Sequence, residues 1–203
     1  MRIVRLAQGT LEWHRWRFEG LGGSDVAAIL GVSPYEDATP DAIFESKLAY
    51  RDREPTFAMR RGTRLERPAR EMFGHRTGWH FEPCCVEHDD ERWMRCSLDG
   101  LGQSFTGGPE LLEIKAPKWT VHDEILSGFV PEHFMVQVQW QLLVTGADLC
   151  HLVSFNDGGR FAGRDQLAHV VIEADGEKQA EILEAASAFW DRVQAARGVA
   201  VAA

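Results

Sequence analysis

The chain has 203 residues, of which 44% are hydrophobic and 26% charged, and a formal net charge of −9. The length fits one domain spanning 1–203, and the composition is that of a folded protein rather than a disordered one. The acidic balance argues against a general nucleic-acid coat protein, because such proteins are usually basic. No apolar run approaches the ~20 residues that cross a bilayer, and the N-terminus lacks the apolar core of a signal peptide. We therefore expect a cytoplasmic protein with no membrane partner.

The first half of the chain is predicted to be mostly helical. Residues 24–31 form a short helix that Ser24 caps and Gly31 ends. A second helix covers about 39–48, with a proline in its first turn. A longer helix is expected at about 58–77, and Pro68 should kink it or mark a local start.

The rest of the chain predicts strands with two further helices. Strands are expected at 81–88, 92–97, 110–115, 149–155 and 168–173, with turn-forming glycines between residues 100 and 109. Helices are expected at 131–145, between Pro131 and Gly146, and at 175–193. Residues 193–203 are expected to form a frayed tail. This order predicts an α/β (α+β) fold, a central mixed sheet flanked by helices.

The four cysteines form no metal-binding pattern. Cys84 and Cys85 are adjacent, and neither Cys96 nor Cys150 completes a C-x2-C pair, so a zinc ribbon is disfavoured. We expect reduced, partly buried thiols. An iron–sulfur cluster, which needs four well-placed cysteines, is the less favoured alternative.

Two carboxylates and a lysine form the constellation that indicates chemistry. Glu113 and Lys115 lie two residues apart on a predicted strand, so their side chains share a face that Ile114 does not. Asp99 comes before that strand. Two carboxylates can hold one or two Mg²⁺ ions, and a lysine can orient water or stabilise charge during phosphodiester hydrolysis. The alternative is a surface ion pair on an edge strand.

Several segments, in one order over residues 11–146, carry a family resemblance. They are Trp13-His14-Arg15-Trp16-Arg17 with Gly22-Gly23-Ser24-Asp25, Arg61-Gly62-Thr63-Arg64-Leu65-Glu66, Cys96-Ser97-Leu98-Asp99-Gly100, Leu112-Glu113-Ile114-Lys115-Ala116-Pro117 and Gln137-Val138-Gln139. Together they resemble the lambda exonuclease (YqaJ-type viral recombinase) family of the PD-(D/E)XK nuclease superfamily. The sequence departs from the pattern at Leu98, where the motif has proline, and in the glycine-rich stretch 100–109, whose length a hairpin loop accommodates at little cost.

The resemblance implies a PD-(D/E)XK restriction-endonuclease-like core and roles for the matching residues. Asp99, Glu113 and the carbonyl of Ile114 would bind Mg²⁺, for which Mn²⁺ can substitute. Glu66 would complete the acidic cluster, directly or through water, and Lys115 would assist the attacking water.

The resemblance also implies a substrate and partners. Arg17, Ser24 and Ser97 would form a pocket for the 5′-phosphate of the digested strand, and Gln137 would line the active site. Such enzymes digest one strand of linear duplex DNA from its 5′ end, as homotrimeric rings that work beside a single-strand annealing protein. Two other hypotheses stay open: a structure-specific or restriction-type endonuclease of the same superfamily, and a non-enzymatic module that binds DNA ends.

Each assigned residue also has a purely structural alternative. Ser24 could serve only as a helix cap, and Arg17 could form an ion pair with Glu12 or Glu19. Glu66 could form an ion pair with Arg70. Gln137 and Gln141 could simply be exposed to solvent. Arg60, Arg64 and Arg67 share one helix face. They are the best local candidates for DNA phosphate contacts, or else they belong to a solvated, salt-bridged helix.

Overall fold

The computed structural model describes residues 1–51, 54–104, 107–158 and 163–202. Six strands form one sheet in sequence order: β1 (Arg2–Val4), β2 (Glu82–Glu87), β3 (Arg95–Gln103), β4 (Pro109–Lys115), β5 (Leu149–Phe155) and β6 (Leu167–Glu173). Neighbouring strands are antiparallel except β4 and β5, which are parallel. The expected mixed sheet is confirmed.

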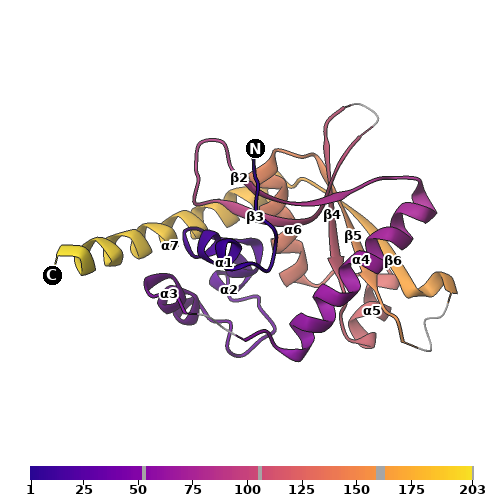
Figure 1. Cartoon of the computed structure of the whole chain (residues 1–203), viewed down its shortest axis with the longest axis horizontal. Coiled ribbons are helices and arrows are strands. Elements are labelled where there is room, and N and C mark those ends of the chain that lie inside the picture. Colours follow the sequence, from indigo (N-terminus) through magenta and orange to yellow (C-terminus); the bar gives the residue numbers. More distant parts are fainter. Residues whose placement is uncertain (52–53, 105–106, 159–162, 203) are drawn as a thin grey trace.

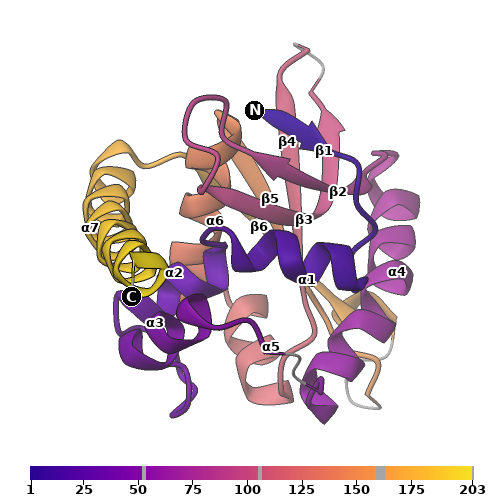
Figure 2. The same cartoon turned by 60° about the vertical axis from the view of Figure 1, so that its left-hand side comes forward.

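Helices lie on both sides of this sheet (Figure 1, Figure 2). They are α1 (Leu11–Phe18), α2 (Gly23–Ile29), α3 (Pro40–Leu48), α4 (Phe57–Thr77), α5 (Trp119–Leu126), α6 (Glu132–Thr145) and α7 (Gly176–Ala202), with a short 3-10 helix at Gly163–Gln166. Helices α5 and α6 carry the chain from β4 to β5, because parallel neighbours need a long crossover connection.

The two faces of the sheet bury two separate cores, and β4 contributes to both. Leu111 packs in the larger core with residues of α2, α6 and α7. Leu112 and Ile114 pack in the smaller core under α4. Side chains alternate along a strand, so Glu113 and Lys115 lie on the same face as Leu111, toward α6.

The helices differ from their predicted form in two places. α2 begins at Gly23 and its N-cap is Gly22, so the prediction that Ser24 caps this helix is wrong. The Ser24 hydroxyl is therefore not used by the cap. Gly31 follows the helix with a φ of +70°, as expected for a glycine at a helix end. α4 continues through Pro68, so this proline marks no new start.

The third strand and the last helix are longer than predicted. β3 continues to Gln103, and Gly100 lies inside it rather than in a turn. A Cβ on Gly100 would be 2.6 Å from the Cβ of Phe81, so glycine serves close packing here. Residues 105 and 106 of the expected loop lie outside the described residues. α7 continues to Ala202, beyond its predicted end at residue 193, and Arg197 anchors it to α1 and α3.

The cysteines agree with the expected reduced thiols. All four cysteines are free thiols, and three of them are buried. Within the described ranges, no helix combines the length and the apolar character needed to cross a membrane.

Candidate active site

Asp99 lies where strands β3 and β4 separate. The ladder between these strands ends at the pair of Gly100 and Leu112. Beyond it, the backbone N–H of Ile114 donates to Oδ2 of Asp99 at 2.7 Å. The Asp99 side chain therefore spans the opening between the strands and lies next to the backbone of Glu113 and Lys115.

Glu113 and Lys115 share one face of β4 and are held by one helix. Nζ of Lys115 donates to Oε1 of Glu113 at 2.5 Å and to Oε1 of Gln137 at 2.6 Å. Nε2 of Gln141 donates to Oε2 of Glu113 at 2.7 Å. Gln137 and Gln141 are one turn apart on α6, so this helix fixes both the lysine and the carboxylate.

Helix α4 brings Glu66 and Arg70 to the other side of the cluster. Nε of Arg70 donates to the carbonyl oxygen of Asp99 at 2.7 Å. Glu66 lies one turn earlier and is close enough to Asp99 and Glu113 to affect their electrostatics. The expected alternative, a simple pair of Glu66 with Arg70, does not describe this arrangement, because Arg70 is directed to the Asp99 backbone.

Burial and crowding raise the proton affinity of Asp99 and Glu66. Burial raises the pKa of Asp99 well above its ordinary value, and the charges of Glu113 and Glu66 add to this effect. Burial and then the charge of Glu113 also raise the pKa of Glu66. Burial would lower the pKa of Lys115, but Glu113 outweighs it and raises that pKa, so the lysine is a cation. A divalent cation would relieve the remaining repulsion.

The donor set suits a hard divalent metal ion. Among the described residues, no three His, Cys, Asp or Glu side chains are placed together to hold a metal ion, so Glu66 does not complete a preformed triad. A smaller set remains: the carboxylates of Asp99 and Glu113 and the carbonyl of Ile114, all oxygen ligands of the kind Mg²⁺ prefers.

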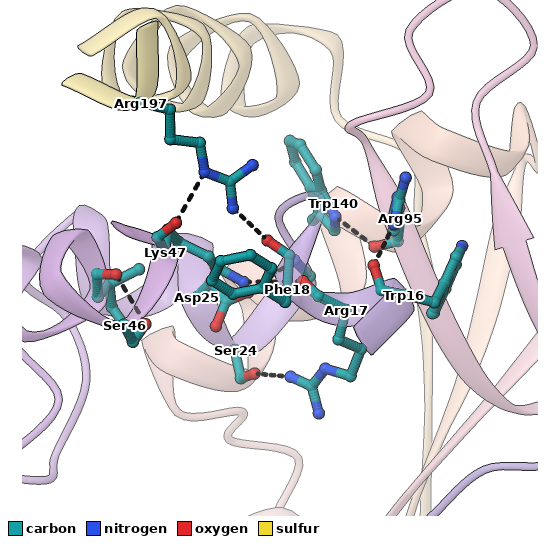
Figure 3. Close-up of polar contacts among 12 residues, drawn as sticks. Trp16, Arg17, Phe18, Ser24, Asp25, Ser46, Lys47, Arg95, Trp140 and Arg197 are labelled. Atoms are coloured by element: carbon teal, nitrogen blue, oxygen red, sulfur yellow. Dashed lines mark hydrogen bonds and ion pairs between the residues drawn. The ribbon is translucent and has the colours of Figure 1, made fainter. Parts of the chain in front are cut away.

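Arg17, Ser24 and Ser97 lie together, and Trp13 connects them. Nη2 of Arg17 donates to Oγ of Ser24 at 3.1 Å (Figure 3). The Arg17 guanidinium lies over the Trp13 ring, 4.9 Å from its centre. The indole N–H of Trp13 donates to Oγ of Ser97 at 2.8 Å. The family resemblance implied this trio, but it gave Trp13, which was quoted only within the opening motif, no part in the pocket.

One pocket of about 180 Å³ joins this trio to β4. Its lining includes Arg17, Ser24, Ser97, Glu113, Lys115 and Gln137, whereas Asp99 and Glu66 do not line it. Glu19, one of the alternative partners considered for Arg17, pairs instead with Arg197 at 2.9 Å. The guanidinium of Arg17 therefore lines a pocket that it shares with Glu113.

One further residue, Gln141, differs from its expected surroundings. Gln141, considered as a solvent-exposed glutamine, is buried against Glu113. Its signal in the sequence is the spacing of four from Gln137, which places both on one helix face.

The arginines on the exposed face of α4 form ion pairs. Arg64 lies 3.5 Å from Asp157, and Arg67 lies 2.8 Å from Glu71. These exposed pairs match the salt-bridged alternative for the arginine face.

Comparison with known proteins identifies the family. The family model of the YqaJ-like viral recombinase domain matches residues 12–148, which is more than half of the chain. The chain belongs to the YqaJ-like viral recombinase family. The resemblance read from the sequence motifs is thereby confirmed, and the matched segment contains every residue of the cluster and the pocket described above. No curated protein matches this YqaJ-like chain.

Solved structures agree with the family and the fold. The YqaJ-like chain is similar to an alkaline exonuclease, LHK-Exo, from Laribacter hongkongensis, with 28% identity, a TM-score of 0.79, and coverage of 94% of this chain and 95% of that chain. A structure of LHK-Exo in complex with dAMP matches at 29% identity with the same coverage and TM-score. A phage-related exonuclease from Haemophilus somnus 129PT shares the fold, with a TM-score of 0.63, 15% identity, and coverage of 87% of this chain and 95% of that chain.

Proposed function

We propose that this protein is a Mg²⁺-dependent exonuclease that digests linear double-stranded DNA in the 5′-to-3′ direction and leaves 3′ single strands. The observation that carries the proposal is the pocket around Arg17 and Ser24, which opens onto Glu113 and Lys115. A terminal phosphate bound there places the adjoining phosphodiester beside the carboxylates. The similarity to LHK-Exo, an alkaline exonuclease, supports the same reaction class.

The cluster supplies the groups that phosphodiester hydrolysis needs. Asp99, Glu113 and the Ile114 carbonyl would hold Mg²⁺, or Mn²⁺ in its place, and the ion would polarise the phosphate and lower the pKa of a water molecule. Lys115, a cation fixed by Glu113 and Gln137, stabilises negative charge on the phosphate and orients the attacking water. Because these contacts already exist, the lysine needs little rearrangement to act.

The pocket gives the enzyme its direction. The guanidinium of Arg17 can bind two phosphate oxygens at once, and the hydroxyls of Ser24 and Ser97 can donate further hydrogen bonds. A terminal phosphate carries more charge and more free oxygens than a phosphodiester within a strand. The pocket therefore favours a 5′-phosphorylated end.

We extend the proposal to the assembly and setting that the family resemblance implies. The protein would form a homotrimeric ring and work with a single-strand DNA annealing protein in phage-type recombination, in the cytoplasm of a bacterial or phage-infected cell. Each subunit has a net charge of −9, so the surface that contacts DNA must be a local basic region on an acidic body. Light scattering that gives the mass of a 22.8 kDa monomer would contradict the ring.

The test uses linear duplex DNA labelled at either end, with Mg²⁺ or with EDTA. One substrate has a 5′-phosphate, a second has a 5′-hydroxyl, and a covalently closed circle is the control. We expect Mg²⁺-dependent digestion from the 5′ end, faster with the phosphate and absent on the circle. Cleavage of the circle would instead indicate an endonuclease, and no cleavage with any divalent metal would indicate a binding module.

A further inference from the structure

We propose that the buried ion pair of Lys47 and Asp25 positions Arg17 and Ser24, and thereby sets the preference for 5′-phosphorylated DNA ends. Lys47 lies on α3 and Asp25 in the first turn of α2, and neither side chain lines the pocket. The inference rests on the proposed function, because it concerns the phosphate pocket proposed there.

The ion pair ties three segments together at one point. Nζ of Lys47 donates to Oδ2 of Asp25 at 2.9 Å and to the carbonyl oxygen of Arg17 at 3.0 Å. The same Oδ2 accepts the N–H of Gly22 at 3.0 Å. Helix α3 thereby holds both the last turn of α1, from which Arg17 projects, and the first turn of α2, which carries Ser24.

Burial of this pair favours a geometric role over a stabilising one. The side chains of Lys47 and Asp25 are only 6% and 12% exposed. The cost of removing two charges from water offsets most of their attraction, so a buried ion pair adds little net stability but fixes one arrangement strongly. Burial would raise the pKa of Asp25, but the charges of Lys47 and Arg17 outweigh it and lower that pKa, so the carboxylate is ionised.

The C-terminal end of α1 depends on contacts of this kind. The helix has eight residues and none of them is buried, so the hydrophobic core does not fix its direction. Consecutive backbone carbonyls at its end each accept a hydrogen bond from a cation on a different element: Trp16 from Arg95 on β3, Arg17 from Lys47 on α3, and Phe18 from Arg197 on α7 (Figure 3). Carbonyls at a helix end lack partners within the helix, and the helix dipole attracts cations there.

The start of α2 packs just as closely against α6, the helix that carries Gln137. A Cβ on Gly23 would lie 3.1 Å from the carbonyl oxygen of Gln137, so the two helices touch through their backbones at this point. Gln137 also holds Lys115. A shift of α2 would therefore move Ser24 relative to the lysine, and Asp25 restrains that shift through Lys47.

The test compares variants by one ratio, the digestion rate on a 5′-phosphorylated end divided by that on a 5′-hydroxyl end. The variants are Lys47→Met, Asp25→Asn and their combination, which replaces the ion pair by neutral groups of similar size. Lys178→Met is the matched control, because it also breaks an ion pair, the one with Glu132, away from α1. Arg17→Ala reports on the pocket itself. Dissociation constants for the same two ends, measured in EDTA, give a second ratio that needs no cleavage.

We expect Lys47→Met to lower the rate ratio at least ~10-fold, equivalent to about 1.4 kcal/mol, and Lys178→Met to leave it at the wild-type value. If Lys47→Met does not fold, the combined variant decides. The positioning role is overturned if folded variants keep the wild-type ratio, or lose both rates equally, while Arg17→Ala abolishes the preference. If Arg17→Ala keeps the preference, or the wild type has none, the proposed phosphate pocket is wrong and this inference fails with it.

Discussion

The backbone N–H of Ile114 donates to Oδ2 of Asp99 at 2.7 Å, directly beyond the last paired residues of β3 and β4. One carboxylate therefore joins two strands and also belongs to the proposed metal site. Asparagine has nearly the same shape and keeps an oxygen for this hydrogen bond, whereas alanine removes it. The two roles can be separated by substitution.

Asp99→Asn is expected to keep the fold and to lose cleavage by at least ~100-fold, because a metal ligand is worth several kcal/mol in the transition state. Its stability should equal or exceed that of the wild type, because the repulsion with Glu113 is relieved. Asp99→Ala should lose cleavage and also about 1–3 kcal/mol of stability, since the Ile114 N–H loses its acceptor. Urea unfolding and cleavage of a 5′-phosphorylated duplex check both, with exposed Asp90→Asn as the control. Wild-type cleavage by Asp99→Asn would remove Asp99 from the mechanism.

Gln141→Leu should lower cleavage about 10- to 100-fold, the usual effect of losing a hydrogen bond that orients a metal ligand. Nε2 of Gln141 donates to Glu113, whereas its buried Oε1 has no hydrogen-bond partner among the described residues. Leucine has a similar size, so we expect little change in the melting temperature. Gln194→Leu, on the exposed face of α7, is the matched control. Equal rates for the two variants would show that Glu113 is held without Gln141.

Gly23→Ala should reduce the preference for 5′-phosphorylated ends and cost about 1–3 kcal/mol of stability. The added Cβ would lie 3.1, 3.2 and 3.3 Å from the carbonyl oxygen, Cα and Cβ of Gln137, and a helix backbone cannot turn aside as a side chain can. Gly62→Ala on α4 is the control, because its Cβ would meet no atom within 4 Å and should stabilise that helix by about 0.5–1 kcal/mol. If Gly23→Ala keeps the wild-type preference and melting temperature, the contact between α2 and α6 is not as tight as described.

His151 predicts how stability depends on pH. It is buried against Trp79, and its Nδ1 and Nε2 of His169 lie 3.0 Å apart in a hydrogen bond. Burial, and then the charge of His169, lower the pKa of His151 from 6.5 to about 4, although Glu110 lies 3.5 Å from its Nε2. The folded state thus keeps this ring neutral where the unfolded state binds a proton. Its contribution to stability is complete above pH 6.5 and is lost as the pH falls toward 4.

The measurement is the free energy of unfolding in urea at a series of pH values. In the window between the two pKa values, each pH unit should cost up to about 1.4 kcal/mol for this one group. His151→Phe, which keeps an aromatic ring in the cluster, should flatten the slope in part, because His169 also titrates with a lowered pKa. An unchanged slope in His151→Phe would show that other groups control the acid sensitivity.

Periodicity was enough to predict β4, α4 and α6, but α1, which carries Arg17, was not predicted. The alternation in β4 predicted that Glu113 and Lys115 share a face, and the structure places them in direct contact. The apolar stripe of α4 predicted that helix despite Pro68, because packing under the sheet outweighs the local cost of proline. β1 was missed, since three residues of Arg2–Val4 form a strand only by pairing with β2.

Contacts between distant segments could not be predicted in this way. Gly100 indicated a turn, yet it lies in β3 because Phe81, the residue just before β2, packs where a Cβ would be. Asp25 was quoted only as part of a motif, and its partner Lys47 comes 22 residues later on a different helix. Nothing in either local sequence indicates that pairing, which depends on how α2 and α3 pack.

The contacts of Arg197 also bear on the order in which parts of the structure form during synthesis. Arg197 reaches the carbonyls of Lys47 and Phe18 across 150 and 179 residues of sequence. A growing chain releases its N-terminal helices from the ribosome first, and they must wait for the last helix before these contacts can form. The strands that carry the carboxylates emerge earlier. A nascent chain therefore acquires the proposed catalytic residues before the support of the proposed end-binding pocket is finished.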